Sequence, residues 1–474
     1  MSPKIQPDSL EKGCYKKLTF SLINALIDEE NIESIREYLS CAPYVVLETL
    51  LKEILKSSDL EENIRFNSLQ MLLREDVKSL ETDMFPKFYH KRILEIILER
   101  GLRLQNLNLK GLWARDCPKL LCDLISNLNE LKCLEIPHIA DDSVIKSLNN
   151  LKYLNVLNIS GDAYYSEEGL KAFKNESLVV LDIGNYGNKD LGFGVETSIS
   201  LVAALIENLP NLAVLKTYSF AGHALQLLHR KNPDFVTKLT YVYDTDTTLD
   251  VFDAIVATCP KLNYAYFHTP CEGVVEQFHR LKDLHTLKLT QGNTNELIKY
   301  LSQSQNKLEV LKINHNKLDA LDIGLLARYA ENLKTLECYY MNLEFPNLDK
   351  LTFRYLSKIQ LIYCDISDKD VMSLMVSTPE AISIHIGSSV DFTDEDILRL
   401  VTEHNFPQLE ELIFSYASNL TDLSVELLVT TCWNLKVLGT LSEWNISELE
   451  FITLKLLFQS TNTDVTLLPL LKIY

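Results

Sequence analysis

The hexapeptide LEVLKI, residues 308–313, decides the fold of this protein. Leu308, Leu311 and Ile313 recur at the spacing of a strand that buries one side, and the residues between them turn to the other side. The preceding segment NELIKYLSQSQNK, residues 295–307, carries its apolar residues at helical spacing. We therefore expect a helix followed by a short strand, each with one apolar side to bury.

The same LxxLxL pattern, or a close variant of it, returns along most of the chain. It begins at residues 104, 131, 154, 178, 212, 239, 262, 284, 308, 333, 356, 381, 409 and 435. A period of mostly about 22 to 28 residues is typical of leucine-rich repeats, whose single units must stack because none can bury both faces alone. We predict an α/β leucine-rich-repeat solenoid with parallel strands on the concave side and helices on the convex side.

Both ends of the chain depart from this pattern. In residues 1–100 the apolar residues recur at helical spacing, and Pro43 and Pro86 separate the predicted helices. We predict a small all-α domain there, which also caps the solenoid. About fourteen repeats are expected in residues 101–441, and a second cap in residues 442–474.

The composition is that of a folded protein with an acidic balance. Hydrophobic residues make up 46% and charged residues 23%, and 46 basic against 65 acidic residues give a formal net charge of -19. Such a field repels phosphate backbones and anionic lipid and favours basic protein partners. No signal-peptide pattern or long apolar run occurs, so we expect the cytosol or the nucleus.

The ten cysteines form no CxxC pair. We expect neither a zinc site nor a disulfide framework, and mostly reduced, buried thiols. The histidines are dispersed, and no nucleophile or carboxylate pair has catalytic spacing. The sequence therefore indicates no enzyme activity and no cofactor.

The segment SLEKGCYKKL near the start of the chain places Leu10, Cys14 and Leu18 four residues apart. On a helix this spacing gives one row with a small thiol at its centre. Such a row can fit the groove of a partner protein. Alternatively, the same row, continued by Leu22 and Leu26, buries one side of the first helix inside the helical domain.

The segment resembles the BC box, with which receptors of the von Hippel-Lindau and SOCS-box type bind elongin C. That pattern is a small residue or proline, leucine, three free positions, cysteine, three more, and an aliphatic residue, and Ser9, Leu10, Cys14 and Leu18 fill every fixed position. The resemblance implies that Leu10 enters a hydrophobic pocket of elongin C and that Cys14 packs beside it. An elongin-binding head before leucine-rich repeats resembles the Zyg eleven, Zer-one and PRAME groups.

In BC-box receptors a cullin box follows, usually a proline that precedes aliphatic positions on a helix. Here CAPYVVLETLLKEIL offers Pro43 at the helix start, with Val46, Leu47 and Leu50 behind it. The resemblance implies that these residues contact a cullin with its RING protein. The same segment can alternatively be a degenerate F-box for Skp1, although a leucine before Pro43 is missing.

Tyrosines gather at outward-facing positions of two predicted strands, LTYVYDT and LNYAYFH. Tyrosine supplies a large contact area at low entropy cost and is common in binding surfaces. Alternatively, cross-strand aromatic pairs only stabilise the sheet, by about 0.2 to 1 kcal/mol per pair. The candidate client-binding residues are Tyr218, Tyr241, Tyr243, Tyr264, Tyr266, His268 and Lys288.

Together these patterns predict a non-catalytic substrate-recognition subunit of an elongin BC cullin-RING ubiquitin ligase. Its partners would be elongin C with elongin B, a cullin with its RING protein, and a protein client held on the concave face. Two alternatives stay open: an F-box-type receptor that binds Skp1, and a leucine-rich-repeat scaffold or inhibitor outside the ligase pathway.

Overall fold

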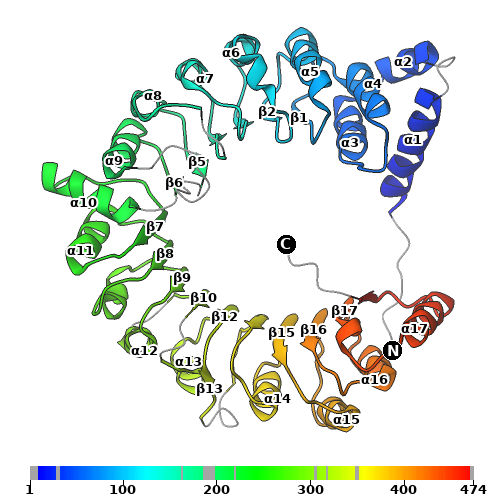
Figure 1. The fold of residues 1–474 in the computed structure, drawn as a ribbon, viewed down its shortest axis with the longest axis vertical. Helices are drawn as coiled ribbons and strands as arrows, with labels where there is room; N and C mark the ends of the chain where they lie inside the picture. Colours follow the sequence, from blue (N-terminus) through cyan, green and yellow to red (C-terminus); the bar gives the residue numbers. More distant parts are fainter. Residues whose placement is uncertain are drawn as a thin grey trace. The chain divides into compact units, whose positions relative to one another are not determined.

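The computed structural model describes residues 9–27, 32–161, 164–184, 198–217, 220–303, 307–315, 319–346 and 352–469. The chain divides into two compact units. The amino-terminal unit comprises Asp8–Asp244 and Ala257–Lys261, and the carboxyl-terminal unit comprises Thr245–Val256 and the chain from Leu262 onward. In each unit parallel strands line one side and helices the other (Figure 1), and we call the strand-lined side the sheet face.

The amino-terminal unit begins with helices and continues into a six-stranded parallel sheet of order β1-β2-β3-β4-β5-β6. Its strands are β1 (Ser79–Glu81), β2 (Asn106–Asn108), β3 (Cys133–Glu135), β4 (Val156–Asn158), β5 (Val180–Gly184) and β6 (Val214–Thr217). Its helices are α1 (Leu10–Ile27), α2 (Ile32–Ser40), α3 (Tyr44–Leu55), α4 (Glu62–Leu72), α5 (Lys87–Arg100), α6 (Pro118–Asn127), α7 (Asp142–Leu148), α8 (Glu167–Lys171), α9 (Ile199–Asn208) and α10 (Ala221–Lys231), with the 3₁₀ turn η2 (Ala114–Asp116).

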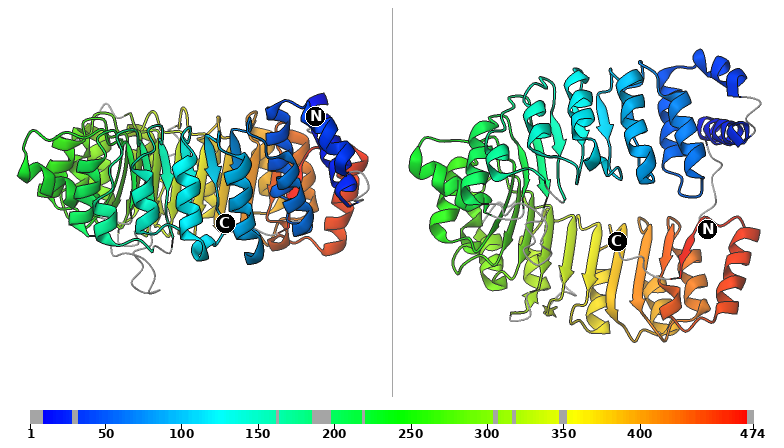
Figure 2. Two further views of the ribbon diagram at one scale, coloured as in Figure 1. Left: turned by 90° about the horizontal axis from the view of Figure 1, so that it is seen from above. Right: turned by 45° about the horizontal axis from the view of Figure 1, so that its top comes forward.

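The strand β7 (Tyr241–Thr245) and the helix α11 (Leu249–Thr258) lie where the chain passes from one unit to the other. The strands that follow are β8 (Tyr264–His268), β9 (Thr286–Thr290), β10 (Val310–Asn314), β12 (Thr335–Tyr339), β14 (Lys358–Ile362), β15 (Ser383–Ser389), β16 (Glu411–Tyr416), β17 (Val437–Gly439) and β18 (Thr466–Leu468). They pair in this order, all parallel (Figure 2).

The other elements of the carboxyl-terminal unit connect these strands. The helices are α12 (Thr294–Gln303), α13 (Ile323–Tyr329), α14 (Asp368–Val376), α15 (Asp394–Glu403), α16 (Asp422–Thr431) and α17 (Glu448–Ser460), with the 3₁₀ segments η4 (Val275–Arg280) and η6 (Leu441–Glu443). A separate small parallel pair joins β11 (Leu321–Asp322) to β13 (Leu343–Glu344).

The core consists of equivalent apolar residues from neighbouring repeats. In and just before β10, Leu308, Leu311 and Ile313 are buried as predicted, and the residues between them are half-buried. The register places Leu311 between Leu287 of β9 and Leu336 of β12, so the leucines of successive strands stack. Every one of the fourteen predicted LxxLxL segments contains a strand. The predicted leucine-rich-repeat fold is therefore confirmed.

The repeats extend further in both directions than the predicted range of 101–441. The strand β1 lies inside the region predicted as all-α and pairs with β2 in the parallel register of the repeats. At the other end β18 pairs with β17. The motif is incomplete at both ends: Thr82 takes the third apolar position at β1, and Asp464 and Pro469 take the first and third at β18, so the sequence pattern fades before the sheet ends.

Candidate functional site

The first helix presents part of the predicted elongin-binding row to solvent. Ser9 precedes α1, and its hydroxyl oxygen accepts a hydrogen bond from the backbone N–H of Lys12 at 3.2 Å, which is the geometry of an N-cap. One residue later, Leu10 keeps 86% of its surface exposed. Cys14 is exposed, and Leu18 is exposed at the margin of the bundle.

The same row of leucines is buried further along α1. Residues on an α-helix are about 100° apart, so each step of four residues turns the row by about 40°. Over the four steps from Leu10 to Leu26 the row turns through about 160°. Leu22 and Leu26 are accordingly buried, while Leu10 points to solvent. Burial of the whole row within the helical domain was one of the two alternatives, and it holds only for the second half of the helix.

The buried half of α1 is what fixes the helix to the rest of the unit. Helix α1 contacts α2, α3 and α4. The exposed half extends beyond this anchor, and we call Ser9, Leu10, Cys14 and Leu18 the α1 ridge. Phe20 is also exposed on α1, but it lies about 80° from Leu10 on the other side of the helix from Leu18.

The predicted cullin-box residues have a different role in the structure. Pro43 is the N-cap residue of α3, as predicted, and Val46 is half-buried. Leu47 and Leu50, however, are completely enclosed in the core of the helical region. The prediction that these two leucines face a partner is therefore wrong: their spacing is that of the buried side of an amphipathic helix, which the sequence pattern does not distinguish from a docking side.

The large apolar residues that α3 presents to solvent lie at its first turn. Tyr44 and Val45 are both exposed, directly after Pro43. The burial of Leu47 and Leu50 also counts against the F-box alternative, because an F-box would need these apolar residues on its surface.

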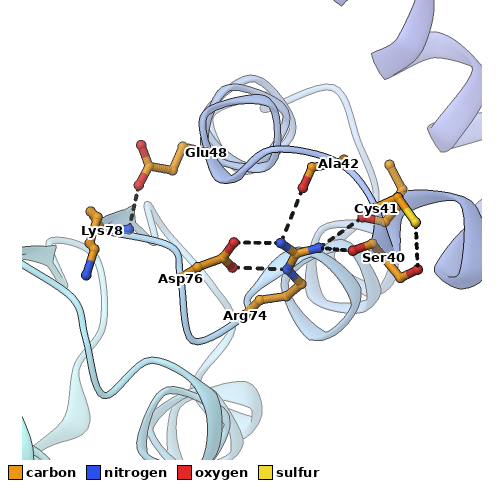
Figure 3. A network of polar contacts seen from close by, with 8 residues as sticks. Ser40, Cys41, Ala42, Glu48, Arg74, Asp76 and Lys78 are labelled. Carbon is orange, nitrogen blue, oxygen red and sulfur yellow. Dashed lines mark hydrogen bonds and ion pairs between the residues drawn. The ribbon is translucent and has the colours of Figure 1, made fainter.

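A polar network holds the α2–α3 corner in place (Figure 3). Arg74 donates hydrogen bonds to the carbonyl oxygens of Leu39 at 3.1 Å, Ser40 at 2.7 Å and Ala42 at 3.2 Å. The same guanidinium binds both carboxylate oxygens of Asp76, at 3.1 and 2.6 Å. Hydrogen bonds from Arg74 lower the pKa of the Asp76 carboxyl, which keeps the pair charged.

A second contact in the same region joins α3 to the sheet. The Glu48 carboxylate accepts hydrogen bonds from the backbone N–H groups of Lys78 at 2.5 Å and Ser79 at 3.0 Å, where β1 begins. The Glu48 side chain thus attaches α3 to the backbone of the first strand, and α1 in turn packs against α3.

The tyrosine candidates fall into separate parts of the structure. Tyr218 lies outside the described residues. In the amino-terminal unit Tyr241 is half-buried, and Tyr243 keeps only 7% of its surface exposed and takes part in side-chain interactions within the protein. The prediction that Tyr243 offers an open face is wrong, because alternation gives the side of a strand but not what covers that side.

In the carboxyl-terminal unit the remaining candidates are half-buried on the sheet face. The Lys288 ammonium lies 4.1 Å from the ring centre of Tyr266, in a cation–π contact between paired residues of β8 and β9. The Tyr266 hydroxyl is 3.3 Å from the Thr290 hydroxyl. Burial raises the pKa of Tyr264, and His268 contacts its neighbour Thr269. These contacts are those of a sheet-stabilising set, which was the alternative interpretation.

Aromatic residues that the sequence analysis missed lie at the carboxyl ends of the strands of this unit. They are His315, Tyr340, Tyr363 and Tyr416. A signal was present, since all four follow the start of an LxxLxL segment at the same offset. Alternation within the strands gave no reason to examine a position just after them.

The cysteines of the structure are free thiols. Only Cys259, Cys338, Cys364 and Cys432 are buried, so the expectation that most of them are buried is wrong. Burial raises the pKa of the Cys259 and Cys432 thiols to about 11, so both act as small apolar residues at neutral pH. Within the described ranges no group of three His, Cys, Asp or Glu side chains could hold a metal ion. Among the described helices, none has the length and apolarity needed to cross a bilayer.

The comparisons with known proteins found similar solved structures. No protein-family model and no curated protein matches the chain. Among solved structures, the yeast complex of Rad7 and Elc1 matches with 17% identity and a TM-score of 0.45, covering 94% of this chain and 96% of the other.

Two further solved structures are similar. A leucine-rich-repeat protein of Leptospira interrogans matches with 15% identity and a TM-score of 0.37, covering 78% of this chain and 96% of its own. An internalin of Listeria monocytogenes matches with 14% identity and a TM-score of 0.35, covering 89% and 94%. At these TM-scores the likenesses carry no argument about partners or activity, and the fold stands on the strand register described above.

Proposed function

We propose that this chain is a substrate-recognition subunit of an elongin BC cullin-RING ubiquitin ligase and that the α1 ridge is its elongin C-binding element. The observation that carries the proposal is the outward direction of Leu10 and Cys14 in a segment that fills every fixed position of a BC box. A leucine this exposed adds little to the packing of its own domain. It is available as an anchor for the groove of another protein.

The surroundings of the ridge favour the same role. Ser9 caps the helix start, and Leu22 and Leu26 hold its second half against the bundle. The ridge is therefore already helical and fixed in direction before a partner arrives, which reduces the entropy lost on binding.

A cullin would then contact the exposed first turn of α3, at Tyr44 and Val45, instead of the enclosed Leu47 and Leu50. The ubiquitin transfer itself would be carried out by other subunits. This chain would contribute proximity and orientation by holding the client.

Affinity capture with purified elongin B and C tests the proposal. The double substitution Leu10→Ala with Cys14→Phe should abolish capture, because it removes the anchor and fills the space beside it. Both side chains are exposed, so the far-UV spectrum and the melting temperature should stay the same. The matched control is Phe20→Ala, which removes an exposed apolar side chain from the same helix away from the ridge and should leave capture intact.

The outcome separates the alternatives. Capture of Skp1 in place of elongin would favour the F-box-type receptor. Capture of neither adaptor by the wild-type chain would leave a leucine-rich-repeat scaffold. If the double substitution lowers the melting temperature by several degrees, the ridge belongs to the core and the proposal fails.

A further inference from the structure

The strands of the carboxyl-terminal unit end in a shared backbone conformation. The residue directly after each of β8, β9, β10, β12 and β14 has a positive φ, at 47° for Thr269, 55° for Gln291, 54° for His315, 55° for Tyr340 and 53° for Tyr363. This left-handed conformation is unfavourable for residues other than glycine. Threonine and glutamine occupy it in the first two repeats, so the fold requires the conformation but not an aromatic ring.

In the next three repeats the residue at this position is aromatic, and the rings stack. The centroids of His315 and Tyr340 are 4.7 Å apart with planes 5° from parallel, and those of Tyr340 and Tyr363 are 5.0 Å apart at 25°. The series continues past β15 to the end of β16, where a hydrogen bond with Tyr363 raises the pKa of Tyr416. We call His315, Tyr340, Tyr363 and Tyr416 the aromatic ladder.

The ladder is open to solvent over much of its length. Tyr363 and Tyr416 are 45% and 42% exposed, His315 is exposed and Tyr340 is half-buried. Between Tyr363 and Tyr416, β15 ends in the small residues Gly387, Ser388 and Ser389. The Ser388 hydroxyl accepts a hydrogen bond from the backbone N–H of Cys364 and donates one to its carbonyl oxygen. Stacked, exposed tyrosines held on rigid strand ends match the composition of a protein-binding surface.

The charges around the ladder determine what can bind there. The described loop residues that follow the strands, 269–273, 291–293, 315, 319–320, 340–346, 363–367, 390–393, 417–420 and 440–446, contain no lysine or arginine. They do contain carboxylates, at Glu272, Asp319, Glu344, Asp365, Asp391 and Glu443. Glu443 is close enough to Tyr416 to contribute to its raised pKa.

Three lysines of the sheet face are already engaged with partners inside the protein. Lys312 and Lys358 bind the Glu337 carboxylate at 2.7 and 2.9 Å, and Lys288 lies over the Tyr266 ring. A cationic ligand at the ladder would therefore meet aromatic rings, hydroxyls and carboxylates. Arginine suits such a surface because its guanidinium stacks on rings and binds carboxylates in a bidentate manner.

From this geometry we infer that the aromatic ladder is the client-binding surface of the carboxyl-terminal unit and that it recognises a basic, arginine-containing segment of a protein. The inference rests on the proposed function only in calling that protein a client. The surface itself is independent of the elongin assignment. Nucleic acid is disfavoured, since the chain carries a formal net charge of -19.

Fluorescence anisotropy with the full chain tests the inference. The probe is a fluorescein-labelled twelve-residue peptide with four arginines spaced by glycine and serine, and the comparison peptide has glutamate in place of arginine. The arginine peptide should bind and the glutamate peptide should not. Tyr340→Leu with Tyr363→Leu should weaken binding on the order of tenfold, the sum of two exposed cation–π contacts.

Two matched controls come from the opposite edge of the same sheet. Tyr355→Leu removes a tyrosine that is 50% exposed at the amino end of β14, the strand that Tyr363 follows, and should leave binding unchanged.

Asp365→Gln with Glu443→Gln should weaken binding at low salt. Glu331→Gln with Glu380→Gln, two exposed carboxylates just before β12 and β15, should not.

Equal loss in the Tyr355 variant, equal binding of the glutamate peptide, or preferential binding of a single-stranded RNA of similar length would each overturn the inference. Elongin capture, measured on the same variants, should stay intact. A negative peptide result with intact capture therefore counts against the ladder alone, and failed capture with intact peptide binding counts against the ligase proposal alone.

Discussion

Gly13 lies among exposed residues of α1, between Leu10 and Cys14 in the chain but beside the α1 ridge, and a glycine there weakens the helix. A Cβ added there meets no other atom within 4 Å, and the residue has ordinary helical backbone. Gly13→Ala should therefore stabilise α1 by about 1 kcal/mol. Hydrogen exchange of the amides of residues 12–17 should slow accordingly, while elongin capture stays unchanged. Faster exchange would mean that the first turns of α1 are not helical in solution.

Glu337 carries a buried negative charge on the sheet face. Its side chain is 6% exposed between Lys312 and Lys358. Burial alone would raise the pKa of this carboxyl, but the hydrogen bonds from the two lysines outweigh it and the pKa is lowered. A carboxyl with a lower pKa in the folded state stabilises the fold above its unfolded pKa of about 4.3 and loses that contribution as pH falls through the folded value.

Glu337→Gln should therefore lower the free energy of unfolding at pH 7, because it leaves two lysines without their shared counterion. The difference from the wild type should shrink as pH falls below the unfolded pKa of about 4.3 and through the lower pKa of Glu337 in the folded state. Urea unfolding at a series of pH values measures this. The exposed Glu331→Gln serves as control and should show a small difference at every pH. A pH-independent difference for Glu337→Gln would contradict the ion-pair explanation.

At the scale of elements, the helical region depends on a few contacts that cross between helices. Arg74 is one of them, since it donates to three carbonyl oxygens at the α2–α3 corner, of which only that of Leu39 also accepts a backbone N–H, from Ala42. Arg74→Met keeps the length of the side chain but removes its hydrogen bonds to these carbonyl oxygens and to the Asp76 carboxylate. We expect a loss of about 1 to 3 kcal/mol.

Hydrogen exchange should report that loss at residues 41–47, and chemical unfolding should report it for the amino-terminal unit. The matched control is Arg92→Met, which removes the exposed ion pairs of Arg92 with Glu95 and Glu99 on α5 and should cost less than about 1 kcal/mol. If both variants lose the same free energy of unfolding, the contacts of Arg74 contribute no more than the exposed ion pairs of Arg92.

The whole molecule contains its two proposed binding surfaces in different compact units. The α1 ridge belongs to the amino-terminal unit and the aromatic ladder to the carboxyl-terminal unit. Substitutions at sites that share no contacts usually have additive effects. A chain with Leu10→Ala, Cys14→Phe and Tyr363→Leu should therefore lose elongin capture as the ridge variant does and peptide affinity as the Tyr363→Leu variant does. A peptide affinity that changes with the ridge substitutions alone would reveal coupling between the units.

Local patterns predicted the elements of this protein but not their surfaces. The strand LEVLKI and the helix after Pro43 are where the spacing of leucines places them, because alternation and helical periodicity are properties of neighbouring residues. The same spacing misassigned Leu47, Leu50 and Tyr243. Each of these lies on the predicted side of its element, but that side is covered by other segments.

The sequence by itself determined the repeat, the parallel strands and the position of the BC-box match, since each depends on residues within one repeat or one helix. Tertiary packing decided that Leu10 is exposed while Leu26 is buried, since that difference arises where α1 meets α3 and α4. It also decided that His315, Tyr340, Tyr363 and Tyr416 come together, although up to about a hundred residues separate them in the chain. Only the stacking of one repeat on the next brings such residues side by side.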